Sequence, residues 1–162
     1  MSTLTTLIEA WDEGHRELGI ALDGVPDDDL WLRPHPRLLS IGEVAGHIAF
    51  AQTVWIVGQD YRCDLSQLSV QSPLVDSAFR YYSVCIEQPA VVLDMNASAV
   101  WEEVQRVHRE VKATLEGRNA DDPVANWETW GNLMQYQVFH VAYHTGQIYS
   151  ARHIFGHQTE DN

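Results

Sequence analysis

The sequence predicts an all-α fold, a four-helix bundle that forms a single domain over residues 1–162. Four long segments carry apolar residues at three- and four-residue steps, which is the period of an amphipathic helix. Almost no stretch alternates apolar and polar residues as a half-buried strand does. The chain has 162 residues, the usual size of one domain, and no internal repeat divides it. Helices of this length and number pack most simply as a bundle.

The first helix is expected over residues 3–22. Its apolar stripe consists of Leu4, Ile8, Trp11, His15, Leu18 and Leu22. A connection should follow from Asp23 to Leu39, because its prolines disfavour helical conformation in the residue before each of them. We expect Leu30 and Trp31 to pack this connection against the bundle.

The second helix is expected from Ser40 to about Tyr61. Its start has the S-x-x-E pattern of a capping box, in which the side chains of Ser40 and Glu43 each satisfy a free backbone N–H. Several alanines and glycines in this helix are small enough to let a neighbouring helix approach closely.

A long connection is expected between the second and third helices. The helical pattern is weak from Arg62 to Ala97, where Pro73 and Pro89 bracket one short helix. Connections of this length usually have a function. We expect this crossover to pass along the bundle or to cover one end of it.

The third helix is expected from Ser98, as its N-cap, to Gly117, where it ends. Its apolar stripe consists of Val100, Val104, Val107, Val111 and Leu115. Asp121 to Gly131 should form another connection. The last helix is expected from about Asn132 to Phe155, with Gly156 as its stop.

Acidic residues outnumber basic ones: 23 Asp and Glu against 10 Lys and Arg give a formal net charge of −13. Such a surface repels phosphate backbones and anionic lipid, so we expect neither nucleic acid nor membrane as a partner. No signal peptide and no apolar stretch of about 18 residues is visible. Cys63 and Cys85 lack CxxC spacing, so no disulfide framework is expected, and a cytoplasmic location fits best.

His140 and His144 lie four residues apart on the last helix, so both imidazoles project from one face and can bind one metal ion. The spacing is that of zinc-binding H-E-x-x-H helices, but valine follows His140. The glutamate that serves those peptidases as base is missing, which excludes a peptidase of that type. Both histidines belong to an inward-facing polar stripe, in which Gln137 and Gln147 should orient the rings or line a pocket.

His47 is the third candidate ligand, because it lies between Val44 and Ala51 on the inward face of the second helix. The alternative for His47 is a hydrogen-bonded core histidine. Three neutral imidazole nitrogens would leave at least one coordination position open, as in catalytic metal sites. Glu43, one turn before His47, is a candidate proton acceptor.

The other histidines are not assigned as ligands. His15 lies on the apolar stripe of the first helix and should be a packed core residue; a fourth ligand or a neighbour of the metal is the alternative. His108 should be half-exposed. His153 and His157 repeat the four-residue spacing, but Gly156 intervenes, and they should form a solvent-facing pair.

Three motifs resemble the DinB-like superfamily: Trp31-Leu32-Arg33-Pro34, then Ser40-Ile41-Gly42-Glu43 followed by His47, and the run from His140 to Gln147. The resemblance spans nearly the whole chain. It implies up-down-down-up connectivity, a divalent metal ion, zinc or nickel, on the three matching histidines, and a homodimer. Characterised relatives include thiol-dependent transferases and isomerases, whereas others are described as metal-dependent hydrolases.

Three functions are compatible with these features. The first is thiol-dependent S-transferase or isomerase chemistry on a small electrophile, in which the metal binds a low-molecular-weight thiol cosubstrate as thiolate. The second is hydrolysis by a water whose pKa the metal lowers. The third is a non-catalytic metal-binding or ligand-binding bundle, since a fold does not determine an activity. The first is the principal expectation.

Overall fold

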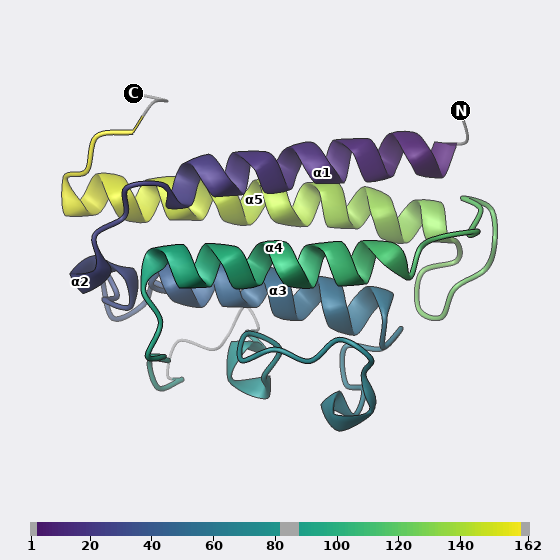
Figure 1. Cartoon of the computed structure of the whole chain (residues 1–162), viewed down its shortest axis with the longest axis horizontal. Coiled ribbons are helices and arrows are strands. Elements are labelled where there is room, and N and C mark those ends of the chain that lie inside the picture. The colour runs from purple at the N-terminus through teal and green to yellow at the C-terminus, as the bar shows by residue number, and fades with distance from the viewer. Residues whose placement is uncertain (1–2, 82–87, 160–162) are drawn as a thin grey trace.

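The computed structural model describes residues 3–81 and 88–159, and all regular structure in these two ranges is helical. The helices are α1 (Thr3–Leu22), α2 (Asp27–Leu30), α3 (Ile41–Ile56), α4 (Ala97–Ala113) and α5 (Trp130–Phe155), with short 3-10 helices η1 (Leu65–Gln67) and η2 (Ser77–Phe79) (Figure 1). The all-α class and the helical bundle are therefore confirmed. No helix in these ranges combines the length and the apolar character needed to cross a membrane.

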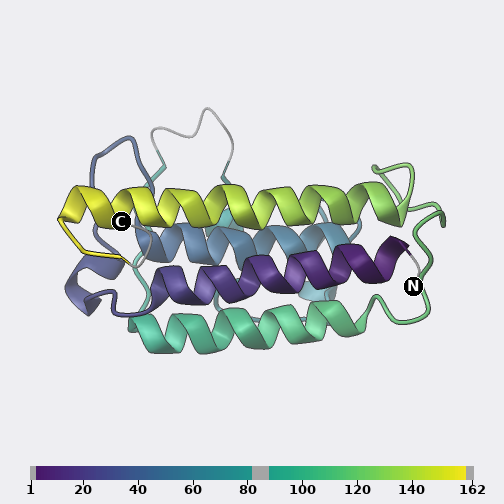
Figure 2. The same cartoon turned by 90° about the horizontal axis from the view of Figure 1, so that it is seen from above.

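The four long helices form two layers, with α1 and α5 in one and α3 and α4 in the other (Figure 1). The helices α1 and α5 run in one direction, and α3 and α4 run in the opposite direction (Figures 1 and 2). Extensive contacts join α1 to α5, α5 to α3 and α3 to α4, whereas α1 and α4 touch less. The core between the layers includes Trp11, Phe50 and Leu133, whose exposed fraction is 0%.

The start of α3 is the predicted capping box. The Ser40 hydroxyl accepts a hydrogen bond from the Glu43 N–H, and the Glu43 carboxylate accepts one from the Ser40 N–H. The predicted end at Tyr61 is wrong, because α3 ends at Ile56. Beyond it the backbone folds back, with the Gly58 N–H bonded to the Thr53 carbonyl, so the polar backbone groups are satisfied by a turn.

The starts of α4 and α5 differ by two residues from the prediction. The N-cap of α4 is Asn96 instead of Ser98, and its side chain accepts from the Ala99 N–H. The helix α5 begins at Trp130, because the Thr129 side chain caps it. In both cases the cap is a residue in extended conformation whose side-chain oxygen accepts a hydrogen bond from a free N–H of the first helical turn.

The connections contain little regular structure. The segment from Asp23 to Leu39 includes α2, where Leu30 is fully buried, and the Trp31 indole donates to the Met95 carbonyl at 2.8 Å. The crossover from α3 to α4 lies along these two helices (Figure 1). The short helix predicted between Pro73 and Pro89 corresponds in part to η2. Residues 82–87, which include Cys85, lie outside the described residues.

Candidate metal centre

Three imidazoles meet between α3 and α5. His47 projects from α3, and His140 and His144 project from successive turns of α5. One ligand atom from each lies within 4.8 Å of the others, and the Nε2 atoms of His47 and His140 are 3.3 Å apart. The structure therefore brings together the three residues that the sequence predicted as ligands.

Hydrogen bonds determine which nitrogen faces the cluster. The Nδ1–H of His47 donates to the Phe79 carbonyl at 2.9 Å, and the Nδ1–H of His144 donates to the Gln147 side-chain oxygen at 2.7 Å. In each ring Nε2 is then the unprotonated nitrogen with a free lone pair. Gln147 thus orients a ring as expected. The Gln137 side chain is buried, and its Nε2 has no partner among the described residues.

Burial keeps all three rings neutral. It lowers the pKa of His47 to about 4, with a contribution from the neighbouring His144. Burial also lowers the pKa of His140 to about 2, assisted by both other histidines of the cluster. The pKa of His144 is lowered by burial as well, and its bond to Gln147 opposes this in part. Neutral imidazole is the form that binds a metal ion.

The nitrogen atoms fit a divalent metal ion. With zinc–nitrogen distances of about 2.0–2.1 Å in a tetrahedral site, two ligand nitrogens lie about 3.3–3.4 Å apart, which matches the distance between His47 and His140. Without a cation, two lone pairs directed at one point would repel each other. Zinc and nickel both accept imidazole ligands. His47 and His140 are buried and His144 is partly exposed, so the cluster faces the surface on the His144 side.

The crossover covers the cluster on the His47 side. The Tyr81 ring lies edge-on to His47, with the ring centres 5.7 Å apart, and its hydroxyl donates to Glu43 at 3.2 Å. Arg33 donates to both carboxylate oxygens of Glu43, at 2.8 and 2.6 Å. This buried ion pair therefore connects the start of α3 with the segment that supplies the Phe79 carbonyl and Tyr81 to His47.

The sequence suggested Phe79 and Tyr81 as aromatic walls of a pocket over the metal, but it did not predict the bond from His47 to the Phe79 carbonyl or that from Tyr81 to Glu43. The Phe79 carbonyl lies 32 residues after His47 along the chain, and a backbone acceptor leaves no signal in side-chain patterns. Tyr136, whose ring centre is 5.5 Å from that of His140, follows the helical spacing and could have been found one turn before its partner.

A family model described as the DinB superfamily matches residues 10–148. The chain belongs to the DinB superfamily. Neither the comparison with curated proteins nor the comparison with solved structures gave a match. The DinB match covers all three clustered histidines and Glu43. A three-histidine group in a DinB chain fits a metal-dependent, enzyme-like protein.

Glu43 of this DinB chain is fully buried, and its carboxylate accepts five hydrogen bonds, from Arg33 twice, the N–H groups of Ser40 and Val91, and the Tyr81 hydroxyl. Burial raises its pKa, but Arg33 and the two N–H donors outweigh burial, so the pKa lies below its ordinary value. Its predicted role as proton acceptor stays a prediction. The contacts observed are those of a positioning residue.

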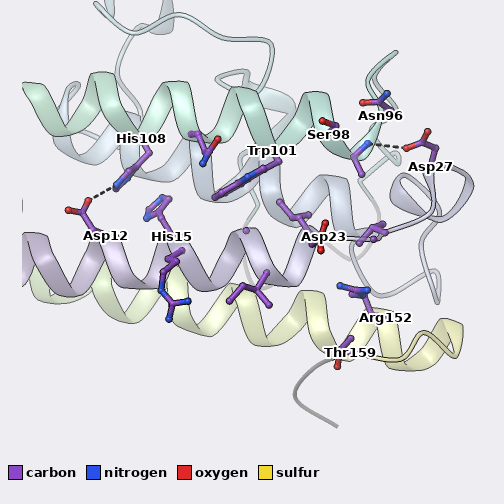
Figure 3. Close-up of a pocket in the computed structure, with 18 of the residues that line it drawn as sticks. Asp12, His15, Asp23, Asp27, Asn96, Ser98, Trp101, His108, Arg152 and Thr159 are labelled. Carbon is purple, nitrogen blue, oxygen red and sulfur yellow. Dashed lines mark hydrogen bonds and ion pairs between the residues drawn. The ribbon is translucent and has the colours of Figure 1, made fainter.

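His15 and His108 lie in a different place, in the DinB bundle between α1 and α4 (Figure 3). His15 is a buried core residue, as expected, and stacks on His108 with ring centres 3.7 Å apart. Burial lowers the pKa of His15 to about 3. The prediction that His108 is half-exposed was wrong: it is 9% exposed and bonded to Asp12 at 2.8 Å, because α1 covers it.

The second histidine pair is only partly exposed. His153 faces solvent, as predicted, but His157 is partly buried and pairs with Asp29 at 2.8 Å. The prediction for His157 was wrong because the chain reverses at Gly156, whose φ is 80°, and brings His157 back to α2. The two rings therefore do not share a helix face.

Proposed function

We propose that this protein is a metal-dependent enzyme of the DinB type, in which His47, His140 and His144 hold zinc or nickel. The observation that supports this most is the convergence of three neutral imidazole nitrogens beside a partly exposed ring. Three protein ligands leave a coordination position for a small molecule, as in catalytic sites. A closed structural site would use four protein ligands, and among the described residues no fourth candidate joins the group.

The reaction that we propose is thiol-dependent transfer or isomerisation of a small electrophile. A divalent metal held by His47, His140 and His144 would lower the pKa of a thiol placed at the open position, whose proton would pass to water. The thiolate sulfur would bond to an electrophilic carbon, and the leaving group would depart with the electron pair of its bond. Cys63 is the only cysteine among the described residues; it packs against Gly58, and burial raises its pKa. An external low-molecular-weight thiol is therefore the proposed nucleophile, and the cytoplasm, where such thiols stay reduced, is the proposed location.

Aromatic rings around the cluster favour a substrate with an apolar body. Tyr136 contacts His140, and Tyr143 contacts His144 with ring centres 5.0 Å apart. Phe139, between them on α5, is 61% exposed and stacks on Tyr143. Such rings shield the site from water and give a small electrophile an apolar surface to bind.

Hydrolysis is the second candidate, because a water at the same position would also lose its proton more easily. Among the described residues no carboxylate joins the cluster, and Glu43 is engaged by Arg33; both observations disfavour hydrolysis. A non-catalytic bundle that binds metal or ligand is the third candidate.

The test is turnover by protein loaded with zinc or nickel, using monochlorobimane with a panel of low-molecular-weight thiols, and esters or amides without thiol. We expect turnover with one thiol, and we expect His144→Ala to reduce it to background. The matched control is His153→Ala, an exposed histidine on the same helix, which should leave turnover unchanged. Ester or amide turnover without thiol would support hydrolysis, and inactivity in every assay would support the non-catalytic bundle.

We also propose a homodimer. The exposed face of α5 supports it, because this face carries Phe139, Tyr143 and Ile154 and no Asp, Glu, Lys or Arg, in a chain of charge −13. Light scattering of wild type and of Tyr143→Glu measures this directly. A dimer that the substitution dissociates is expected, and a wild-type monomer would contradict it.

A further inference from the structure

A cleft separates α1 from α4 at the side of the bundle where these helices touch least (Figure 3). Its volume is about 1150 Å³, and its walls come from α1, α4, the end of α5 and the turn after α1. None of the three clustered histidines lines it. A small organic molecule of ordinary size would fit.

The cleft is richer in basic residues than the rest of this acidic protein. Four of the ten Lys and Arg residues line it, but only three of the 23 Asp and Glu residues do. The four cations are Arg16, Arg109, Lys112 and Arg152, and the three carboxylates are Asp12, Asp23 and Asp27. Asp12 is already paired with Lys112 and His108, and Arg16 is paired with Glu13, which lies outside the lining. The preference for an anionic ligand therefore depends on a cation of the cleft that has no such partner.

Arg152 is a buried cation of the cleft that has no counter-ion among the described residues. It is 6% exposed, its Nη1 donates to the Ala21 carbonyl at 2.8 Å, and its Nε has no partner among the described residues. No ion pair of Arg152 with a described carboxylate is present, whereas the similarly buried Arg33 is paired with Glu43. A buried guanidinium without an anion is costly, and a carboxylate that binds it through two parallel hydrogen bonds would remove that cost.

Trp101 gives the cleft an aromatic wall. Its indole lies directly on α1 at Gly19, where an added Cβ would come within 2.5 Å of the ring. Figure 3 shows Trp101 between His15 on one side and Arg152 on the other. An aromatic ring of a ligand can stack on this indole.

The far end of the cleft presents a free hydrogen-bond acceptor. The Nδ1–H of His15 donates to the Trp11 carbonyl, and the buried Gln52 side chain of α3 bonds to the same ring, so His15 is engaged on both sides. The Nε2–H of His108 donates to Asp12, and its Nδ1, which has no partner among the described residues, is the acceptor. A ligand group at this end must donate a hydrogen bond, as a hydroxyl does.

We propose that the cleft binds an aromatic carboxylate that carries a hydroxyl at its opposite end. The carboxylate pairs with Arg152, the ring stacks on Trp101, and the hydroxyl donates to Nδ1 of His108. His108 stacks on His15, and His15 and Ala21, the contact of Arg152 on α1, lie six residues apart on that helix, which corresponds to about 9 Å. A hydroxyphenyl ring with a short carboxylate chain spans this distance.

The test is calorimetric titration of the metal-loaded protein with four probes: 4-hydroxyphenylacetate, phenylacetate, 4-ethylphenol and tyramine. We expect 4-hydroxyphenylacetate to bind most tightly, and the probe without hydroxyl and the probe without carboxylate each to bind about tenfold or more weakly, since each lacks one hydrogen-bonded anchor. Tyramine, in which an ammonium replaces the carboxylate, should not bind. Equal affinity for all four probes, or no binding of 4-hydroxyphenylacetate, would overturn the proposal.

Two variants and removal of the metal test whether the probe binds in this cleft. Arg152→Met should weaken 4-hydroxyphenylacetate about tenfold or more and leave 4-ethylphenol unchanged, and Arg62→Met, an exposed arginine outside the cleft, should change neither. Equal loss of both probes in Arg152→Met would contradict the ion pair. Binding should persist after chelation of the metal, and its loss would place the carboxylate on the metal and overturn the proposal. The probe comparison uses the wild type and does not depend on the folding of a variant.

Discussion

At the scale of single residues, Glu43 has two structural functions. Its carboxylate completes the capping box of α3 and also holds Arg33 and Tyr81. The first contact was predictable, because the S-x-x-E pattern is local. The others join segments that are distant in sequence, and the ion pair is removed from solvent, with exposed fractions of 14% for the Arg33 side chain and 0% for that of Glu43.

Glu43→Gln should destabilise the fold by about 3–5 kcal/mol, because it leaves the buried Arg33 without an anion. The matched control is Glu103→Gln, which breaks a more exposed pair with Arg106 and should cost about 1 kcal/mol or less. Urea unfolding measures both. If Glu43 were instead the proton acceptor of the reaction, its substitution would abolish turnover with little change in stability.

The pH dependence of this contribution has a definite sign. The pKa of Glu43 is lowered from an ordinary value of 4.5, because Arg33 and the N–H donors outweigh burial. The unfolded chain therefore takes up a proton before the folded chain does as the pH falls. The ion pair contributes its full stability above about pH 4.5, and this contribution is lost as the pH falls through the folded pKa. The free energy of unfolding should therefore decrease less below pH 4.5 in Glu43→Gln than in the wild type.

At the scale of helices, two glycines in helix interiors differ in the space around them. An added Cβ at Gly46 of α3 would come within 2.3 Å of the Phe79 ring, whereas at Gly146 of α5 it would meet nothing within 4 Å. Gly46→Ala should therefore destabilise the protein and disturb the segment that holds His47. Gly146→Ala should stabilise it by about 0.5–1 kcal/mol, through helix propensity alone.

Thermal unfolding of the two glycine variants, in buffer with and without metal, separates these effects. A rise in the unfolding temperature of both variants would show that Phe79 does not pack on Gly46. A fall in both would show that Gly146 has a packing partner that the single chain does not contain.

The helices were largely predictable from the sequence, and their ends were less so. Apolar stripes located α1 and α4, the capping box located the start of α3, and Gly156 located the end of α5, since residue spacing and caps are local signals. The end of α3 was misplaced by five residues, because Val57 and Tyr61 keep a four-residue apolar spacing past Ile56 while the backbone turns. Side-chain spacing carries no information about that turn.

The site was predictable to the extent that it depends on helix faces. His47, His140 and His144 meet because each occupies an inward position of a long helix. The Phe79 carbonyl and the Arg33 pair depend on how the crossover returns along the bundle, which no local pattern encodes. His108 was misassigned for the same reason, since the cover that α1 gives it is a tertiary contact.

At the scale of the whole molecule, buried neutral histidines should make the metal-free protein sensitive to mild acid. Burial lowers the pKa of His15 to about 3, of His47 to about 4 and of His140 to about 2, and lowers those of His108 and His144 as well. The unfolded chain binds protons near the ordinary value of 6.5, and the folded chain does not. Stability should therefore fall as the pH drops below about 6.5, by up to about 1.4 kcal/mol per pH unit for each histidine.

Urea unfolding in the presence of a chelator, at pH 7.5 and pH 5.5, measures this loss. A clearly smaller free energy of unfolding at pH 5.5 is expected. An equal free energy at both values would show that the imidazoles are hydrated and able to protonate in the folded protein.

The central claim, that His47, His140 and His144 form a metal centre, is tested most directly by elemental analysis of purified protein. The comparison is between wild type, the double variant His140→Ala, His144→Ala, and the control double variant His153→Ala, His157→Ala, which removes a pair with the same spacing in sequence. We expect about one equivalent of zinc or nickel per chain in wild type and control, and almost none in the first double variant. Equal metal content in all three proteins would contradict the metal centre.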